Sequence, residues 1–406
     1  MNGVPQRKAR VDSVDLLRGL IMAIMMLDHT RDFIHSAAFN FDPTNVARTY
    51  PILFFTRWIT HFCAPLFVFL AGTGAYFQGM RGKSKGELSR FLVARGLWFI
   101  FVELAILRVV IFFTTDYGAL LAFLQVIWVI GWSLIFLAAV IHLPRQWILF
   151  IGLAMIALHN TLDGVKVTTW TGPGSAVPGF AASLWQILHQ SGVIFPLGYP
   201  GHAVLVLYPL IPWIGVMCAG YVFGSIYELP ERDRRRRLLQ LGAAVTLGFV
   251  VLRALNVYGD PIPWSPQPTA TKTVMSFLAV SKYPPSLLYL MMTLGPAMLL
   301  LAAFERHARI PLGRVLTTFG RVPFFFYVLQ WLTAHTFAII ASRLAGKPTD
   351  YLFSNIGFSA VPPPGAGFNL GVVYAFWILG LMLLYPLCRW FAGVKSRRRD
   401  WWLSYL

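Results

Sequence analysis

The sequence has 406 residues and a formal net charge of +18; 57% of its residues are apolar and only 12% are charged. Soluble domains carry about 25% charged residues, so the composition excludes a single water-soluble fold and requires lipid as part of the solvent. The positive balance does not indicate nucleic-acid binding, because the lysines and arginines fall in short segments between apolar runs, where they set membrane topology.

Ten apolar runs are long enough to predict transmembrane helices. We therefore expect an all-α polytopic membrane protein that forms a single domain over residues 1–406. One further helix, interfacial or re-entrant, is expected within 180–195. The predicted spans in chain order are 14–36, 52–79, 92–113, 119–142, 146–160, 202–225, 238–255, 284–304, 319–342 and 369–391.

The basic residues provide a test of this count. Placing alternate loops on opposite sides of the membrane gathers most lysines and arginines, including the run 234–237, on the side of the N-terminus. By the positive-inside rule, this pattern predicts ten helices with both termini in the cytoplasm. The three cysteines, Cys63, Cys218 and Cys388, lie within apolar runs, and we expect neither a disulfide framework nor a zinc site from them.

The first predicted span carries more ionisable side chains than a lipid-facing helix tolerates. Arg18 and His29 are eleven residues apart, so they share one face of a helix and lie about 16 Å apart along its axis. This arrangement puts a guanidinium near the cytoplasmic end and an imidazole near the outer end, which suits a substrate that passes through the bilayer. The complete set is Arg18, Asp28, His29, Arg31, Asp32 and His35.

His29 is a candidate general base, because imidazole titrates near neutral pH. Asp32 follows it by three residues, which is contact spacing on a helix, and would orient the ring or stabilise its cation. Asp28 is placed to pair with Arg31, three residues further on, or with residues of another helix near Asp32. The alternative is that the whole cluster is solvated charge at the outer interface and only caps the helix.

The second predicted span enters from the outside and places His61 at a depth similar to that of His29. Pro65, Gly72 and Gly74 in this span suit a kinked, closely packed helix that lines a cavity. A packing histidine without a chemical role is the alternative interpretation for His61.

Polar residues in later segments are weaker candidates. Glu103 in the third span is expected to pair with an arginine on another helix. Gln330, Trp331 and His335 form a polar patch in the ninth span. The outer histidines have no convincing metal-ligand spacing, so no metal is expected; they are His159, His189 and His202.

Several stretches resemble one family of membrane proteins. The opening VDSVDLLRGL at 11–20, which leads into MLDHTRDF at 26–33, is similar to the start of heparan-α-glucosaminide N-acetyltransferase-like proteins, and most similar to their bacterial branch. Further matching stretches cover nearly the whole chain: HFCAPLFVFLAG at 61–72, YPLIPWIG at 208–215, KYPPSLLY at 282–289 and GRVPFFFY at 320–327.

A second resemblance concerns spacing. Arg18 and His29 are similar to the arginine–histidine motif of acyltransferase-three-type membrane enzymes, which acylate sugars and also have ten core spans with cytoplasmic termini. The two resemblances imply transfer of an acetyl or other acyl group from cytosolic acyl-CoA, usually acetyl-CoA, to a sugar-type acceptor at the far face. They imply that His29 is catalytic and that Arg18 helps to hold the donor.

The sequence also departs from the family pattern. The heparan-modifying enzymes show asparagine at the position of His29 and a histidine further on, for which His35 is the nearest candidate here. Relatives more often show histidine where this chain has Gln330. The base is therefore left open between His29, His35 and His61, with Asp28 and Asp32 as supporting carboxylates.

We interpret the chain as a transmembrane acyltransferase of the bacterial inner membrane, with lipid, an acyl donor and a glycan or other sugar-containing acceptor as its partners. No nucleic-acid partner is expected, and an oligomer is compatible with the sequence. The alternative is a transporter or flippase for a polar or glycan-linked solute, because intramembrane charges and glycine-broken helices are typical of such proteins too.

Overall fold

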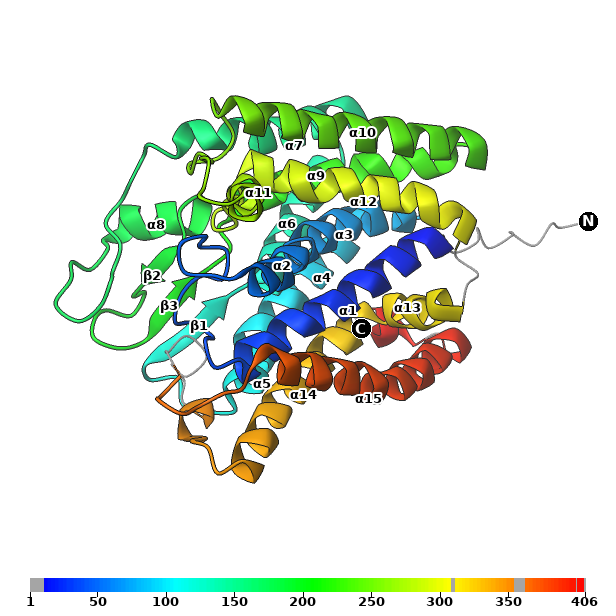
Figure 1. Ribbon diagram of the computed structural model, residues 1–406. Helices are drawn as coiled ribbons and strands as arrows, with labels where there is room; N and C mark the ends of the chain where they lie inside the picture. The colour runs from blue at the N-terminus through cyan, green and yellow to red at the C-terminus, as the bar shows by residue number, and fades with distance from the viewer. Residues whose placement is uncertain (1–10, 308–310, 354–361, 399, 405–406) are drawn as a thin grey trace, which may run out of the picture.

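The computed structural model describes residues 11–307, 311–353, 362–398 and 400–404, and it is mostly helical. Most of the helices run side by side along one direction, and a small sheet with a short helix lies at one end of the bundle (Figure 1). This architecture and the apolar helices make the chain a polytopic membrane protein. Several basic residues of the predicted cytoplasmic side lie outside the described residues: Arg7, Lys8, Arg10, Arg309 and Arg399.

The helices of the first half follow one another with few long loops. They are α1 (Asp12–Ile34), α2 (Pro51–Thr60), α3 (Cys63–Gly79), α4 (Lys85–Phe101), a π-helical turn (Val102–Leu107), α5 (Arg108–Phe112), α6 (Val126–Val140), α7 (Arg145–Leu158), a 3-10 turn (His159–Leu162), α8 (Phe180–Leu188) and α9 (Leu210–Phe223). The second half comprises α10 (Glu231–Leu255), α11 (Ala270–Leu278), α12 (Leu287–His307), α13 (Pro311–Arg321), α14 (Pro323–Leu344) and α15 (Leu370–Arg397).

Six helical segments among the described residues are long and apolar enough to cross a membrane: Pro51–Gly79, Leu210–Glu228, Glu231–Leu255, Leu287–Arg306, Pro323–Leu344 and Leu370–Arg397. Of the four other predicted spans, α1 has the required length but carries many charges, and α6 and α7 are short, with 15 and 14 residues. The fourth, 92–113, is divided among α4, the π-helical turn and α5, and contains Arg95, Glu103 and Arg108. The predicted helix within 180–195 is present as α8.

The all-α prediction is wrong in one region, because three strands form a sheet at the end of the bundle. β1 (Leu120–Leu124) pairs in parallel with β3 (Ala203–Val206), which pairs antiparallel with β2 (Gly192–Ile194). The first residues of the predicted spans 119–142 and 202–225 are therefore strand. Short apolar runs do not distinguish a buried strand from a buried helix by periodicity, and both strands run directly into apolar helices.

The predicted span 52–79 is a broken helix, and proline explains the break. Pro65 has no N–H to donate to the carbonyl four residues earlier, which belongs to His61. The hydroxyl of Tyr289 on α12 donates a hydrogen bond to that carbonyl at 2.7 Å. The kink therefore fixes α3 against α12 and holds His61 at the junction between α2 and α3.

A similar break divides the predicted span 319–342. Its first residues belong to α13, which ends at Arg321, and Pro323 begins α14. The chain changes direction here because proline is favoured at the first position of a helix and disfavoured in its interior.

α1 lies inside the bundle, in contact with α2, α3, α12, α13, α14 and α15. Its closest approach is to α13, where two glycines meet. A Cβ on Gly19 would lie 1.7 Å from the carbonyl oxygen of Leu316, and a Cβ on Gly320 would lie 1.8 Å from that of Asp15. Small residues allow two membrane helices to approach this closely, so this contact sets the position of the first turns of α1.

We predict that Gly19→Ala or Gly320→Ala lowers the free energy of unfolding by at least about 1–3 kcal/mol, because the added methyl group has no room. Reversible unfolding in mixed detergent micelles measures this change. Gly74→Ala is the matched control, because no atom lies within 4 Å of its Cβ position. Equal stability of Gly320→Ala and Gly74→Ala would contradict the described contact.

Candidate functional site

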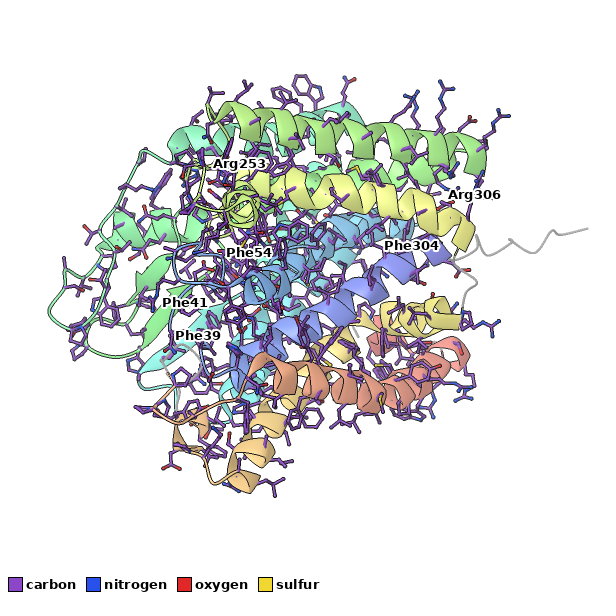
Figure 2. All side chains as sticks on the ribbon, viewed as in Figure 1. Phe39, Phe41, Phe54, Arg253, Phe304 and Arg306 are labelled. Carbon is purple, nitrogen blue, oxygen red and sulfur yellow. The ribbon has the colours of Figure 1, made fainter. Side chains whose placement is uncertain are left out.

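A cavity of about 860 Å³ opens between the first turns of α1 and parts of α3, α4, α6, α10, α12 and α14. It lies at the end of the bundle opposite the sheet, where the last turn of α12 carries Phe304 and Arg306 (Figure 2). Seven basic and four acidic side chains line it. They are Arg18, Arg81, Arg95, Arg234, Arg306, Arg321 and Lys395, with Asp12, Asp15, Glu231 and Glu305.

Arg18 is held where the glycines of α1 and α13 meet. Its Nη1 donates hydrogen bonds to Asp15 Oδ1 at 3.0 Å and to the carbonyl oxygen of Gly320 at 3.3 Å. Its side chain is 19% exposed and lines the cavity. The glycine contact that positions α1 therefore also positions this guanidinium.

Carboxylates neutralise part of the positive charge around the cavity. Glu305 pairs with Arg234 and accepts a hydrogen bond from Ser13 Oγ at 2.6 Å. Asp12 lies 3.7 Å from Arg321. The lining retains an excess of basic over acidic side chains, which favours an anionic ligand such as a phosphate group.

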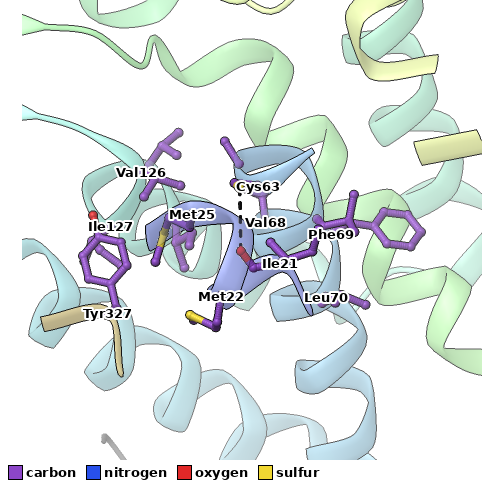
Figure 3. Packing of buried hydrophobic residues seen from close by; sticks show 14 of the residues in the cluster. Ile21, Met22, Met25, Cys63, Val68, Phe69, Leu70, Val126, Ile127 and Tyr327 are labelled. Carbon is purple, nitrogen blue, oxygen red and sulfur yellow. Dashed lines mark hydrogen bonds between the residues drawn. The ribbon is translucent and has the colours of Figure 1, made fainter. Parts of the chain in front are cut away.

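Apolar side chains lie between this cavity and the C-terminal half of α1. Met22 is the last residue of α1 that lines the cavity, and His29 does not line it. Met25, one turn beyond Met22, is 4% exposed and belongs to the same buried cluster as Ile127 and Tyr327. Figure 3 shows these side chains converging from α1, α6 and α14. Ile127 and Tyr327 also line the cavity, whereas on α1 the lining stops at Met22, about two turns before His29.

The C-terminal half of α1 holds a cluster of acidic and basic side chains. Asp28 accepts hydrogen bonds from Arg31 at 3.0 Å and from Arg57 of α2 at 2.5 Å. Arg31 also donates to Asp32 at 2.6 Å. The predicted pair of Asp28 and Arg31 is confirmed, and Arg57 adds a second arginine. Shared hydrogen bonds between opposite charges allow these groups to be buried.

His29 lies beside this cluster. Its ring packs on that of Trp331 of α14, with 3.5 Å between the ring centroids. Its Nδ1 lies 4.0 Å from Asp32 Oδ2 and has no hydrogen-bond partner among the described residues. The side chain is 14% exposed. The predicted contact between His29 and Asp32 is therefore present, at ion-pair distance and without a hydrogen bond.

The other two candidate bases have different surroundings. His61 is 2% exposed, and its ring lies edge-on to Tyr289 with 5.4 Å between the centroids. His35 follows the last residue of α1, where it pairs as an isolated bridge with Phe368 and its Nδ1 accepts a hydrogen bond from the backbone N–H of Ala37 at 3.2 Å. His35 therefore belongs to the packing of the loop that follows α1.

Two basic residues near His29 were not predicted as part of the site. Arg57 lies within an apolar run four residues before His61, and this spacing places both on one helix face. Lys282 was considered only as part of the stretch 282–289 that resembles the family, but the residue is 9% exposed and its charge lies close enough to act on Asp28, His29 and His61. No sequence pattern indicates the approach of Lys282 to this cluster, because it lies more than 200 residues from α1 and α2.

Glu103 does not pair with an arginine as predicted; no described arginine is within ion-pair distance of it. Its Oε2 accepts a hydrogen bond at 2.9 Å from the backbone N–H of Trp128. The carboxyl group therefore caps the N-terminus of α6, which favours a negative charge. The π-helical turn that contains Glu103 turns this side chain toward α6.

The polar patch predicted on α14 is buried. Gln330 and His335 are 0% exposed, and their side-chain polar atoms have no hydrogen-bond partners among the described residues. His335 is stacked between the rings of Phe33 and Phe113, with centroid distances of 4.5 and 3.9 Å. Trp331, between them in the sequence, connects this patch to His29.

A family model described as heparan-alpha-glucosaminide N-acetyltransferase, catalytic, matches residues 10–258. The chain belongs to this family. The matched region is more than half of the sequence and extends from the start of α1 to just beyond α10, so it includes Arg18, His29 and His61. The family is one of membrane acetyltransferases, whose donor is acetyl-CoA. No curated protein matches the chain.

The hydrogen bonds of Asp28 predict how substitutions in the ionic cluster change the free energy of unfolding. Asp28→Asn leaves Arg57 buried without its carboxylate, which costs about 3–5 kcal/mol. Adding Arg57→Gln removes the unpaired charge and recovers part of that loss. A double-mutant cycle, measured by unfolding in mixed detergent micelles, determines the coupling between the two residues.

The exposed pair of Arg145 and Glu228 is the control for this cycle. Its atoms lie 3.4 Å apart and its side chains are 56% and 43% exposed, so Arg145→Gln is expected to cost less than about 1 kcal/mol. If Asp28→Asn and Arg145→Gln had equally small effects, the cluster would not be a buried charge network.

Proposed function

We propose that this protein transfers an acetyl or other acyl group from cytosolic acyl-CoA to a sugar-type acceptor at the extracytoplasmic face of a bacterial inner membrane. One observation carries the proposal. A single helix of a membrane acetyltransferase presents an arginine to a large basic cavity at one end and, eleven residues later, a partly exposed histidine with an unpartnered ring nitrogen at the other.

The cavity is suited to the donor. Its volume of about 860 Å³ falls within the range of about 300–1,000 Å³ that is usual for small-molecule sites. Guanidinium groups bind phosphate with paired, charge-assisted hydrogen bonds, and coenzyme A carries several phosphate groups. In this proposal Arg18 and the other arginines of the lining hold the nucleotide part, and the acyl arm points along α1.

His29 is the proposed general base. It is more exposed than His61, and its Nδ1 is not engaged, whereas Nδ1 of His35 already accepts a backbone hydrogen bond. His61 and His35 remain the alternative bases, and we assign them packing roles. The carboxylate of Asp32, 4.0 Å from Nδ1 of His29, would stabilise the imidazolium that forms. Asp28 would hold Arg31 and Arg57 in place.

These groups account for the bonds formed and broken and for the proton that is transferred. The imidazole of His29 takes a proton from an acceptor hydroxyl or amine. The acceptor oxygen or nitrogen then forms a bond to the acyl carbon, and the carbon–sulfur bond breaks. The coenzyme leaves as a thiolate and receives a proton, so that His29 returns to its neutral form. A transient acyl-histidine would use the same imidazole and the same donor.

The apolar residues between the cavity and His29 must separate for this reaction to occur. Met22 and Met25 are suited to such movement, because methionine side chains are unbranched and have three rotatable bonds. A dry passage between them would also limit hydrolysis of the thioester. In the proposed topology of ten spans with cytoplasmic termini, the cavity opens to the cytoplasm and the sheet lies outside.

Transport without chemistry is the second candidate function. Two polar regions separated by an apolar barrier near the middle of the bundle are also the arrangement expected of alternating access. The two functions differ in one respect: only the acyltransferase makes a covalent product from the donor.

The test uses purified full-length protein, acetyl-CoA carrying a radiolabel in its acetyl group, and a cell-envelope extract as the source of acceptor. Wild type is expected to transfer label to a glycan fraction, and His29→Ala is expected to reduce the rate by at least about 100-fold, as removal of a general base does. Arg18→Ala is expected mainly to raise the KM for acetyl-CoA.

His202→Ala is the matched control, because His202 is an exposed histidine of the outer side, and it should retain the wild-type rate. His61→Ala and His35→Ala, if folded, distinguish the alternative bases. Full activity of His29→Ala would exclude the proposed base. Uptake of a solute without any label transfer by wild type would favour transport.

A further inference from the structure

Three potential metal ligands meet near the sheet, at the end of the bundle opposite the basic cavity. His159 and Asp163 lie in and directly after the 3-10 turn that follows α7, and His189 follows the last residue of α8. One ligand atom from each side chain lies within 4.8 Å of the others. The group therefore joins two segments that are about 30 residues apart in the sequence.

His159 indicates a missing ligand. It is 2% exposed, and neither of its ring nitrogens has a hydrogen-bond partner among the described residues. Burying such a group without compensation is unfavourable, and unsatisfied buried groups in native structures often mark an absent water or ion. The ring lies beside that of His189, tilted by 55°, with 5.6 Å between the centroids.

The other two side chains are oriented toward the same point. His189 is 2% exposed; its Nε2 lies 3.7 Å from Asp163 Oδ1 and donates to the backbone carbonyl of His159 at 2.9 Å. Asn160 Nδ2 donates to Asp163 Oδ2 at 2.8 Å. This hydrogen bond fixes the carboxylate and leaves Oδ1 directed at His189, an arrangement in which an outer group orients a metal ligand.

Contrary to the expectation from their spacing in the sequence, we propose that His159 and His189, together with Asp163, form a binding site for a transition-metal ion, of which Zn²⁺ is the best match. Two imidazoles and one carboxylate are a ligand set for Zn²⁺ or Fe²⁺ and not for Mg²⁺ or Ca²⁺, which prefer oxygen ligands. Ligand atoms around tetrahedral zinc lie about 3.4 Å apart, so small side-chain rotations close the site. His189 then exchanges its contact with the carbonyl of His159 for the metal.

The ion would cross-link the segments that carry its ligands. Asn160 also accepts a hydrogen bond at 2.9 Å from the backbone N–H of Leu287, the first residue of α12. The site therefore connects α7, α8 and the start of α12. With three protein ligands the fourth position is open to water. This proposal is independent of acyl transfer, since none of its residues belongs to the cavity or to the cluster around His29.

The test uses full-length protein with an affinity tag that contains no histidine. The protein is treated with a chelator, incubated with Zn²⁺ and dialysed, and its metal content is measured by mass spectrometry. Wild type is expected to retain about one equivalent of zinc. Asp163→Asn removes the charged ligand and keeps the shape of the side chain; it should weaken zinc binding at least tenfold. His159→Ala should abolish it.

His142→Ala and His202→Ala replace exposed histidines and should retain zinc like wild type. Cobalt binding to wild type provides a second measurement that needs no variant, because tetrahedral Co²⁺ bound to imidazole and carboxylate has intense visible absorption. Wild type without stoichiometric zinc or that cobalt spectrum, or equal zinc retention by folded His159→Ala, would overturn the proposal.

Discussion

The structure depends on one constraint: α1 carries ionised side chains through the bundle and must keep them away from lipid. Asp28 satisfies this constraint by accepting hydrogen bonds from both Arg31 and Arg57, which links α1 to α2. Removing Asp28 would leave Arg57 buried without its carboxylate. The surrounding helices α3, α12, α13, α14 and α15 therefore enclose α1 and separate its polar face from the bilayer.

The same placement of α1 connects the two halves of the proposed mechanism. The glycine contact with α13 brings Arg18 into the basic cavity, and the contact with α14 places His29 against Trp331. Met25 and its apolar neighbours lie between the two ends. In our account, they are the barrier that keeps water from the thioester, and the donor must displace them to reach the imidazole.

The sequence predicted the features that depend on residues close to one another along the chain. Hydropathy located the helices, and helical spacing predicted both the pair of Asp28 and Arg31 and the contact of His29 with Asp32. The sequence did not predict contacts between distant segments. These are the pairing of β1 with β3, the capping of α6 by Glu103, and the approach of Lys282 to the ionic cluster. In each case the partner lies on another element, and hydrophobic periodicity carries no information about which elements pair. The catalytic roles of the predicted site residues remain proposals.

The most direct measurement is an experimental structure of the protein with a thioether analogue of acetyl-CoA that cannot be cleaved. Our account predicts that the phosphates lie against Arg18 and the other cavity arginines, that Met22 and Met25 have moved apart, and that the acetyl group lies next to the ring of His29. An analogue bound in the cavity with its acetyl end still on the near side of a closed Met25, or bound elsewhere on the protein, would contradict the account.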